Sequence, residues 1–225
     1  MDITRKCNED YFEIIDTEDK AYWLGFLYAD GCVSKDGKQT VLGLANEDVD
    51  HIKLFNKCIK STYEITHPDN NRYSRLTITK KKFTENLINK GCVPAKSLIL
   101  KFPTEEQVPK KLLKHFIRGY FDGDGCLSTI LRTIKGKPNP IMDCEVNFLG
   151  TLDMLTGITE NIPIKNIRIF KFGKIYKFRI RNKKDIITLL DYLYEDSHFY
   201  LKRKYNKYLD NVKNYITKRH PSKNK

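Results

Sequence analysis

Two stretches of the sequence, residues 20–34 (KAYWLGFLYADGCVS) and residues 114–128 (KHFIRGYFDGDGCLS), decide how this chain folds. They carry the same residue at six equivalent positions, namely Lys20/Lys114, Gly25/Gly119, Asp30/Asp124, Gly31/Gly125, Cys32/Cys126 and Ser34/Ser128. Most of the remaining pairs exchange one apolar residue for another. The period is too long for a solenoid, and the repeat therefore predicts two similar halves related by an approximate two-fold axis.

The sequence that follows each copy also repeats. A strand-like stretch (40–46 and 143–149) precedes an apolar run with helical period, and two further strand-like stretches come next, 62–66 with 72–79 and 164–172 with 175–181. A helix near 80–90 or 182–194 ends each unit. We therefore predict an α+β fold in which each half reads helix, strand, strand, helix, strand, strand, helix.

The proposed units have definite boundaries. The first half covers residues 1–100, the second covers 101–196, a proline-containing linker at 91–109 joins them, and 197–225 forms a basic C-terminal helix and tail.

Charge points towards a polyanionic partner. The chain of 225 residues has a net charge of +13 and a pI near 9.3. Residues 1–103 hold 16 basic and 15 acidic side chains, whereas the remainder holds 25 and 13, so the excess lies in the second half. Such asymmetry favours nucleic acid first and an anionic membrane surface second.

Several classes of protein are disfavoured. The longest apolar stretch, around 21–29, is too short to span a bilayer, and no basic start followed by an apolar run marks a signal peptide. The six cysteines are far apart and form no C-x-x-C motif, which argues against a zinc site or a disulfide framework. Reduced thiols predict an intracellular, reducing compartment, either the cytoplasm or an organelle matrix.

Small residues recur within the two motifs. Gly25 and Ala29 lie four residues apart in the first copy, as Gly119 and Gly123 do in the second. On a helix, each pair shares one face, and small side chains there let two backbones approach closely. Glycine inside a helix costs about 1 kcal/mol relative to alanine, so Gly25 and Gly119 indicate a packing need. We predict that the two motif helices pack side by side through these glycines.

Asp30 and Asp124 follow directly, each before a glycine of the kind that ends helices. Packed helices would bring both carboxylates to one place, and a divalent cation would relieve their repulsion. Mg²⁺ is usually held by one or two carboxylates with water and phosphate oxygens, and Mn²⁺ is a possible substitute. Such a site can activate water and neutralise charge during phosphodiester hydrolysis. The alternative is that each aspartate only helps to end its helix; the recurring pair favours the metal site.

The stretches WLGFLYADG (23–31) and IRGYFDGDG (117–125) resemble the two motifs of single-chain LAGLIDADG homing endonucleases. The resemblance extends over about residues 15–195. It implies two antiparallel sheets forming a saddle on DNA, the motif helices at the centre, a monomer, and Mg²⁺-dependent double-strand cleavage with short 3′ overhangs in intron homing. By position, Asp30 and Asp124 become the metal-binding catalytic aspartates, and Ala29 and Gly123 offer backbone oxygens. Asp122 takes a non-catalytic position.

Alternation along the strands predicts which face meets DNA. Apolar residues at 76, 78, 146, 148, 178 and 180 point to one side of the sheets. The other side carries the candidates for base and phosphate contacts, namely Arg75, Thr77, Thr79, Asn147, Lys177, Arg179 and Arg181. A solvated surface is the competing interpretation of these faces.

Further polar residues are candidates for the active site. Asn46 ends the second strand of the first half, and its counterpart in the second half is Leu149 or Gly150, so the site is expected to be asymmetric. Lys80 and Arg181 end the fourth strands, from which they could stabilise the transition state. Lysines in or beside the linker, namely Lys96, Lys101, Lys110 and Lys111, are expected to touch backbone phosphate if they touch DNA at all.

Two other functions stay open at this level. A DNA-binding protein with silent catalysis could use the same fold, although retention of both Asp30 and Asp124 argues against it. An intron-encoded maturase that binds RNA would use the same basic surface. The primary prediction remains a sequence-specific endonuclease acting on double-stranded DNA, with no membrane partner.

Overall fold

The computed structural model describes residues 5–68, 72–133 and 141–214. Residues 69–71, between two of the predicted strands, and residues 215–225, the end of the predicted basic helix and tail, lie outside the described residues. The first half contains α1 (Glu18–Asp30), β1 (Gly31–Val33), β2 (Thr40–Ala45), α2 (Val49–Cys58), β3 (Ile65–Thr66), β4 (Tyr73–Ile78) and α3 (Lys81–Asn89). The second half contains α4 (Leu113–Asp124), β5 (Cys126–Arg132), β6 (Ile141–Gly150), α5 (Leu152–Glu160), β7 (Phe170–Phe172), β8 (Ile175–Ile180) and α6 (Lys183–Tyr194).

Segments outside this repeat join and extend the halves. Short 3₁₀ turns occur at Asn46–Asp48, Lys96–Leu98 and Lys110–Leu112, and the last two lie in the connection between the halves. After α6, the chain forms α7 (Lys202–Tyr208) and a π-helical turn at Leu209–Lys213.

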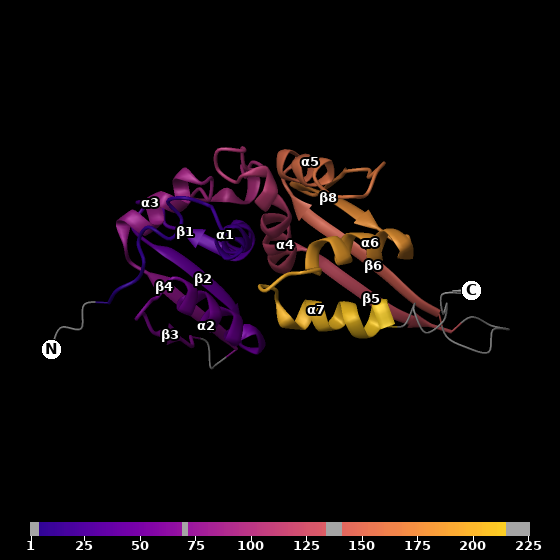
Figure 1. Ribbon diagram of the computed structural model, residues 1–225, viewed down its shortest axis with the longest axis horizontal. Coiled ribbons are helices and arrows are strands. Elements are labelled where there is room, and N and C mark those ends of the chain that lie inside the picture. The colour runs from indigo at the N-terminus through magenta and orange to yellow at the C-terminus, as the bar shows by residue number, and fades with distance from the viewer. Residues whose placement is uncertain (1–4, 69–71, 134–140, 215–225) are drawn as a thin grey trace.

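Each half forms a four-stranded antiparallel sheet, with strand order β1-β2-β4-β3 in the first and β5-β6-β8-β7 in the second. The predicted α+β class and the repeated αββαββα order are therefore confirmed. Helices α1 and α4 lie together at the centre, with one sheet to either side (Figure 1).

Two strands are shorter than predicted. The stretch 62–66 is strand only at Ile65–Thr66, and the stretch 164–172 is strand only at Phe170–Phe172. In the second half, Asn166 adopts a positive φ of 59°, a left-handed conformation that interrupts a ladder. The chain therefore does not pair with β8 until Phe170, which lies opposite Lys177.

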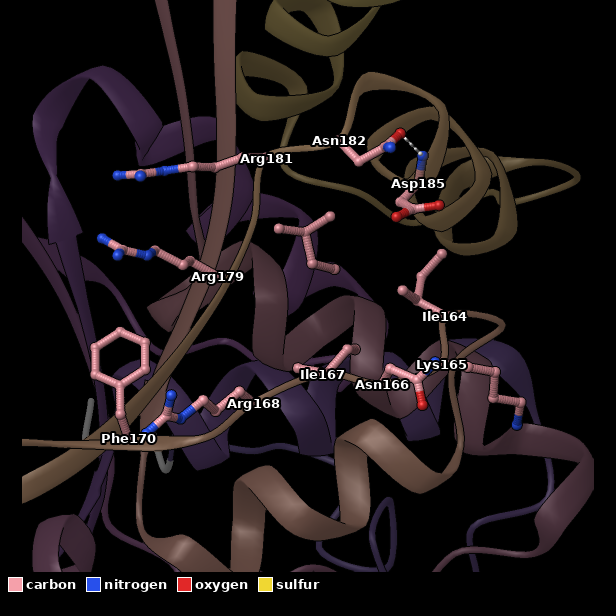
Figure 2. A pocket seen from close by; sticks show the side chains of 11 residues that line it. Ile164, Lys165, Asn166, Ile167, Arg168, Phe170, Arg179, Arg181, Asn182 and Asp185 are labelled. Carbon is pink, nitrogen blue, oxygen red and sulfur yellow. Dashed lines mark hydrogen bonds between the residues drawn. The ribbon is translucent and has the colours of Figure 1, made fainter.

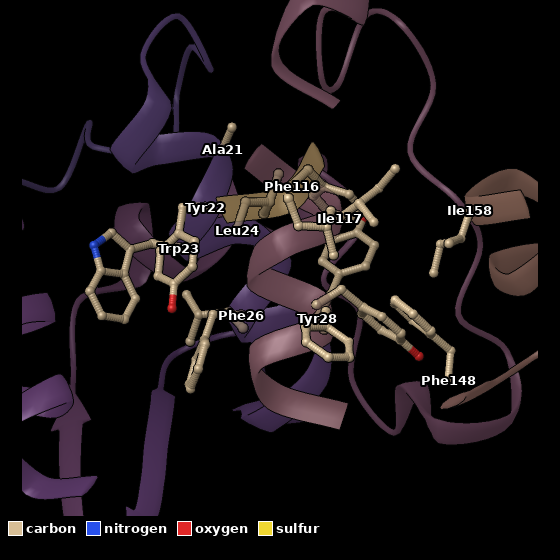
Figure 3. Packing of buried hydrophobic residues seen from close by; sticks show 14 of the residues in the cluster. Ala21, Tyr22, Trp23, Leu24, Phe26, Tyr28, Phe116, Ile117, Phe148 and Ile158 are labelled. Atoms are coloured by element: carbon tan, nitrogen blue, oxygen red, sulfur yellow. The ribbon is translucent and has the colours of Figure 1, made fainter. Parts of the chain in front are cut away.

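The packing of α1 against α4 depends on the two predicted glycines. A Cβ atom on Gly25 would lie 2.0 Å from the Phe116 carbonyl oxygen, and one on Gly119 would lie 2.0 Å from the Tyr22 carbonyl oxygen. These obstacles are backbone atoms, so any side chain would push the helices apart. Every residue of α1 from Ala21 to Tyr28 is buried, because α4 and a sheet cover it from different sides (Figure 3).

Gly31 and Gly125, which follow the two aspartates, are needed for a different reason from the one predicted. Both helices do end there, but Gly31 has φ −75° and ψ 151°, and Gly125 has φ −74° and ψ 157°. These are extended conformations open to any residue, so a left-handed helix end is not the reason for glycine. The reason is space, because a Cβ atom would lie 2.5 Å from the Leu27 carbonyl oxygen or 2.1 Å from the Phe121 ring.

Candidate active site

The close approach of the helices continues to their C-terminal ends. A Cβ atom on Gly123 would lie 2.3 Å from the Ala29 Cβ atom and 3.2 Å from an Asp30 carboxylate oxygen. The Asp30 carboxylate therefore lies against the end of α4 at Gly123, the residue directly before Asp124. As the sequence predicted, the repeat brings Asp30 and Asp124 to one place.

The electrostatics of the pair reflect this convergence. Burial, followed by the negative charge of Asp124, raises the pKa of Asp30 from 3.8 to about 6. Burial also raises the pKa of Asp124. For both carboxylates, the positive charges of Lys96 and Lys204 oppose the rise. Two partly desolvated carboxylates of like charge are a candidate functional site on physical grounds.

The two lysines occupy matching positions at the helix ends. Lys96 Nζ donates to the Ala29 carbonyl at 2.9 Å and to the Gly31 carbonyl at 2.5 Å. Lys204 Nζ donates to the carbonyls of Phe121 at 2.6 Å, Gly123 at 3.3 Å and Gly125. Ala29 and Gly31 are the repeat equivalents of Gly123 and Gly125, so each motif helix ends on an ammonium group, a placement that the helix dipole favours.

The lysine charges act crosswise. Lys96 binds the end of α1, yet its charge lowers the pKa of Asp124 more than the charge of Lys204 does. Lys204 binds the end of α4, yet it is the stronger of the two lysines in lowering the pKa of Asp30. The lysine bound at the end of each motif helix is therefore the one whose charge most favours the ionised carboxylate of the other motif helix.

Sequence reasoning missed this pair. From the sequence, Lys96 is expected to touch backbone phosphate if it touches DNA at all, and Lys204 is one of many basic residues in the C-terminal stretch. The two lysines lie 108 positions apart (204 − 96), whereas the motif repeat has an offset of 94 (114 − 20), so aligning the halves does not align them. The only signal would have been a lysine shortly after the last helix of each half.

Asp122 holds the segment that carries Lys204. Its buried carboxylate accepts hydrogen bonds from Tyr22 Oη at 2.8 Å, Tyr194 Oη at 2.7 Å and the Leu201 amide at 2.7 Å. These bonds join α1, α4, α6 and the start of α7. The arrangement agrees with the non-catalytic interpretation of Asp122.

An ion pair and a hydrogen bond tie the same segment to the first half. Arg203 pairs with Asp48 at 2.8 Å, and Glu18 accepts from the His198 amide at 2.8 Å. Glu18 also pairs at 2.7 Å with Arg118, which is fully buried in α4. Residues 198–204 therefore contact both halves before Lys204 reaches the carboxylates.

The surroundings of the two aspartates differ. Beside Asp124 lies a cavity of about 260 Å³ whose lining includes Tyr28, Lys96, Tyr120 and Thr151. In the first half, Tyr73 lies across Gly43, since a Cβ atom there would come 1.5 Å from the Tyr73 hydroxyl. Gly43 follows Leu42 in β2, and Leu42 pairs with Gly31, the residue directly after Asp30. The two surroundings therefore differ through other residues than Asn46, on which the predicted asymmetry depends.

The proposed auxiliary residues do not come together. Asn46 lies beyond the end of the sheet where Ala45 pairs with Tyr73, whereas Lys80 lies beyond the opposite end, where Thr40 pairs with Ile78. The Asn46 carboxamide oxygen accepts from Ser74 Oγ at 2.5 Å, and Lys80 pairs with Glu9 at 3.4 Å.

The strand register also changes the alignment of the halves. Cys32 pairs with Val41, and Cys126 pairs with Asn147. Counting along the strands makes Leu152 the equivalent of Asn46, in place of the expected Leu149 or Gly150. The same counting makes Thr79 the equivalent of Arg181, so Lys80 and Arg181 do not form a symmetric pair.

The alternating faces of the strands are as predicted. Leu76, Ile78, Phe178 and Ile180 are buried, and the exposed members of the opposite face include Arg75, Thr79, Arg179 and Arg181. Thr77 and Lys177 are half-buried on that face.

An acidic side chain lies within the basic face of the second half. Glu145 pairs with Arg181 at 2.7 Å and with Lys177 at 3.8 Å. Partial burial raises the pKa of Glu145, but the Arg181 hydrogen bond and the nearby positive charges outweigh it and hold the pKa below its usual value. Asn147, at 6% exposure, is covered although it lies on the predicted face.

The donor set at the aspartates suits a hard cation. Carboxylates of Asp30 and Asp124 and the nearby carbonyls of Ala29 and Gly123 are all oxygen donors, the type that Mg²⁺ prefers. In the structure, both carbonyls accept hydrogen bonds from the lysines described above. Across the described residues, no group of three or more His, Cys, Asp or Glu side chains forms a metal-binding cluster. Solvent and phosphate oxygens would therefore have to complete the shell.

Comparison with solved structures defines the class of fold. The LAGLIDADG meganuclease I-AabMI, bound to uncleaved DNA, matches with a TM-score of 0.61 and 12% identity over 89% of this chain and 91% of that chain. The I-LtrWI LAGLIDADG homing endonuclease, bound to target DNA, matches with a TM-score of 0.62 and 12% identity over 96% and 94%. I-SmaMI, bound to an uncleaved DNA target in the presence of calcium ions, gives 0.64 and 11% over 90% and 93%.

This chain therefore has the fold of the LAGLIDADG homing endonucleases, as its two motifs led us to expect. No model of a protein family matches the sequence, and no curated protein matches it significantly. Among the helices that the structure describes, none has the length and apolar character needed to cross a membrane.

The raised pKa of Asp30 gives a testable pH dependence. An aspartate with a folded-state pKa of about 6, against 3.8 when unperturbed, binds more protons folded than unfolded between these values. The contribution of Asp30 to the stability of the metal-free protein should therefore fall as pH rises from about 4 to about 6, and Asp30→Asn should remove this part of the pH dependence. Thermal unfolding between pH 4 and 8 tests this. Glu105→Gln, at an exposed position in the connection between the halves, is the control and should leave the pH dependence unchanged.

Proposed function

We propose that this protein is a sequence-specific endonuclease that makes a double-strand break in DNA by Mg²⁺-dependent phosphodiester hydrolysis, leaving short 3′ overhangs. The observation that carries the proposal is the delivery of Asp30 and Asp124 to one place by two glycine-packed helices. The repeated sheets, each with a basic or polar face, supply a surface for the duplex. Because one chain already contains both halves, we propose that it acts as a monomer in intron homing.

The two aspartates and the two lysines would have distinct roles. Ionised Asp30 and Asp124 would hold the cation between the helix ends. Lys96 and Lys204 would keep these carboxylates ionised near neutral pH and would hold positive charge beside the scissile phosphates. When bound, Mg²⁺ would neutralise phosphate charge and lower the pKa of a bound water molecule. The approximate two-fold relation would present this machinery to both DNA strands.

Selection of cleaved sites from a randomised duplex library is the decisive experiment. With Mg²⁺, the protein should recover one family of sites with short 3′ overhangs, whereas EDTA should abolish cleavage. Replacement of Mg²⁺ by Mn²⁺ should retain it. Binding without cleavage under all metal conditions would instead support a silent DNA-binding protein, and preferential binding of intron RNA would support a maturase.

The crosswise lysines predict a shift in the pH profile of cleavage. Lys204→Met keeps much of the side-chain volume but removes the charge that most lowers the pKa of Asp30. The pKa of Asp30 should rise, so metal binding should require a higher pH. We expect cleavage about fivefold lower at pH 6, because a tenfold rise in the proton affinity of Asp30 would cut its ionised fraction there from about a half to about a tenth, and recovery towards pH 8.

Single-turnover cleavage from pH 5.5 to 8.5 tests this shift. Lys96→Met should shift the profile through Asp124. Lys202→Met, an exposed position on the same helix as Lys204, is the matched control. Equal losses at every pH would show that Lys204 does not act through the carboxylate.

A further inference from the structure

A groove opens at the outer edge of the second sheet, where the chain before β7 separates from β8. Its volume is about 500 Å³. Ile164, Ile167 and Ile180 contribute apolar surface, and basic side chains come from the preceding loop and from β8. Figure 2 shows Arg168, Arg179, Arg181 and Phe170 on one side of the groove and Asp185 on the other.

The equivalent positions of the first half provide a comparison for this groove. Thr66 pairs with Arg75 in the first half, and Phe170 pairs with Lys177 in the second. Counting two residues back from Thr66 and from Phe170 makes Glu64 the equivalent of Arg168. Along the neighbouring strands, Thr77 and Thr79 are equivalent to Arg179 and Arg181. The same three positions therefore carry a net charge of −1 in the first half and +3 in the second.

The two halves also differ in packing at this place. In the first half, Tyr63 is buried at 4% exposure, and its hydroxyl lies 3.0 Å from Thr79 Oγ1. The equivalent of Tyr63 in the second half is Ile167, which is smaller and carries no hydroxyl. Arg181, the equivalent of Thr79, turns towards Glu145 instead. The edge of β8 beyond Phe170 is consequently left beside an open groove.

The charged groups around the groove leave a positive surplus. Lys165, Arg168, Arg179 and Arg181 contribute four positive charges, and the carboxylates that face them are Asp185 within the groove and Glu145 on the sheet. Arg179 lies over the Phe170 ring at 5.4 Å. Arg168 is exposed and is two residues from Phe170, so its guanidinium group lies on the same side (Figure 2).

We propose that this groove binds the sugar–phosphate backbone of the DNA duplex beyond the part that lies over the sheet, and that it does so in the second half only. Guanidinium groups bind phosphate oxygens through paired hydrogen bonds, and the half-buried Ile167 offers contact to the apolar face of a sugar. The bound site is therefore longer at the end held by the second half. The identity of the polymer rests on the proposed function, but the asymmetry rests on the groove itself.

Affinity for duplex DNA at several salt concentrations tests the groove without knowledge of the target. Arg168→Ala should make the slope of log affinity against log salt less negative by about 0.9, the contribution of one phosphate contact. Arg168→Glu, which introduces the residue found at the equivalent position of the first half, should weaken binding further. Lys57→Ala removes one exposed positive charge from α2 and should leave the slope unchanged.

Ethylation interference locates the contact on a target selected by cleavage or, if the protein does not cleave, on one selected by binding. Modified phosphates should block binding further from the centre at the end held by the second half, and Arg168→Ala should remove only this outer interference. Cleavage with a symmetric footprint and an unchanged slope for both Arg168 variants would overturn the groove while leaving the endonuclease intact. An asymmetric footprint without any cleavage would support the groove and contradict the endonuclease. Loss of RNA binding alone in the variants would overturn the assignment to duplex DNA.

Discussion

Asp30→Asn and Asp124→Asn should each reduce double-strand cleavage by about 1000-fold or more. A neutral amide holds a divalent cation poorly, and the charge stabilisation that a metal ion supplies is worth several kcal/mol, with each 1.36 kcal/mol equal to a factor of ten in rate. Binding of DNA in the absence of Mg²⁺ should be retained, because these variants remove negative charge from a surface that meets a polyanion. Cleavage and binding should be measured on the same duplex.

The two aspartate variants also report on their coupling. Because the charge of Asp124 contributes to the raised pKa of Asp30, Asp124→Asn should return the Asp30 pKa towards its usual value. NMR titration of the Asp30 carboxylate measures this change directly. Near-normal cleavage by both variants would remove the catalytic assignment. Accumulation of nicked product with only one of them would show that the carboxylates serve the two strands unequally.

Gly119→Ala should destabilise the fold by about 3 kcal/mol or more. On an exposed helix the same change would be favourable by about 1 kcal/mol, but here the new Cβ atom would lie 2.0 Å from the Tyr22 carbonyl oxygen and 2.8 Å from the Phe26 amide nitrogen. Backbone atoms cannot turn aside as a side chain does, so the helices must separate, and overpacking of this kind costs about 1–3 kcal/mol and sometimes more.

Urea unfolding of Gly119→Ala, Gly25→Ala and Lys57→Ala checks this. The first two should unfold at much lower urea concentration, because Gly25 meets the Phe116 carbonyl oxygen at the same 2.0 Å. Lys57→Ala lies on the exposed side of α2 and should change little. Wild-type stability in either glycine variant would show that the helices are not held together through these positions.

The central part of the fold was predictable because local sequence determines it. The paired motifs place Gly25, Gly119, Asp30 and Asp124 on helices by spacing alone, and alternation along the strands assigns buried and exposed faces. Both patterns involve residues that are close together in the chain, so they can be recognised in a single sequence. The class of fold follows from the order of such elements.

The details that were missed depend on tertiary contacts. Gly31 reads as a helix-ending glycine, but only the position of the Leu27 backbone and side chain shows that space is the reason for it. Lys204 reads as one basic residue among many until Asp122 and Asp48 place its segment beside the motif helices. Asn46 and Lys80 are both active-site candidates because each ends a strand, yet the antiparallel register puts them at opposite ends of the sheet.

The contact between Glu18 and His198 spans 180 residues. Contacts of such separation close large loops and form slowly. During synthesis, α1 and α4 can meet once residue 124 has left the ribosome, and Lys96 is already available at that point. Lys204 emerges 80 residues later (204 − 124), together with the segment that Glu18 and Asp122 hold. If the motif helices pack before Lys204 emerges, both carboxylates come together with only one ammonium group to offset their repulsion, so the paired site is complete only when the last segment is in place.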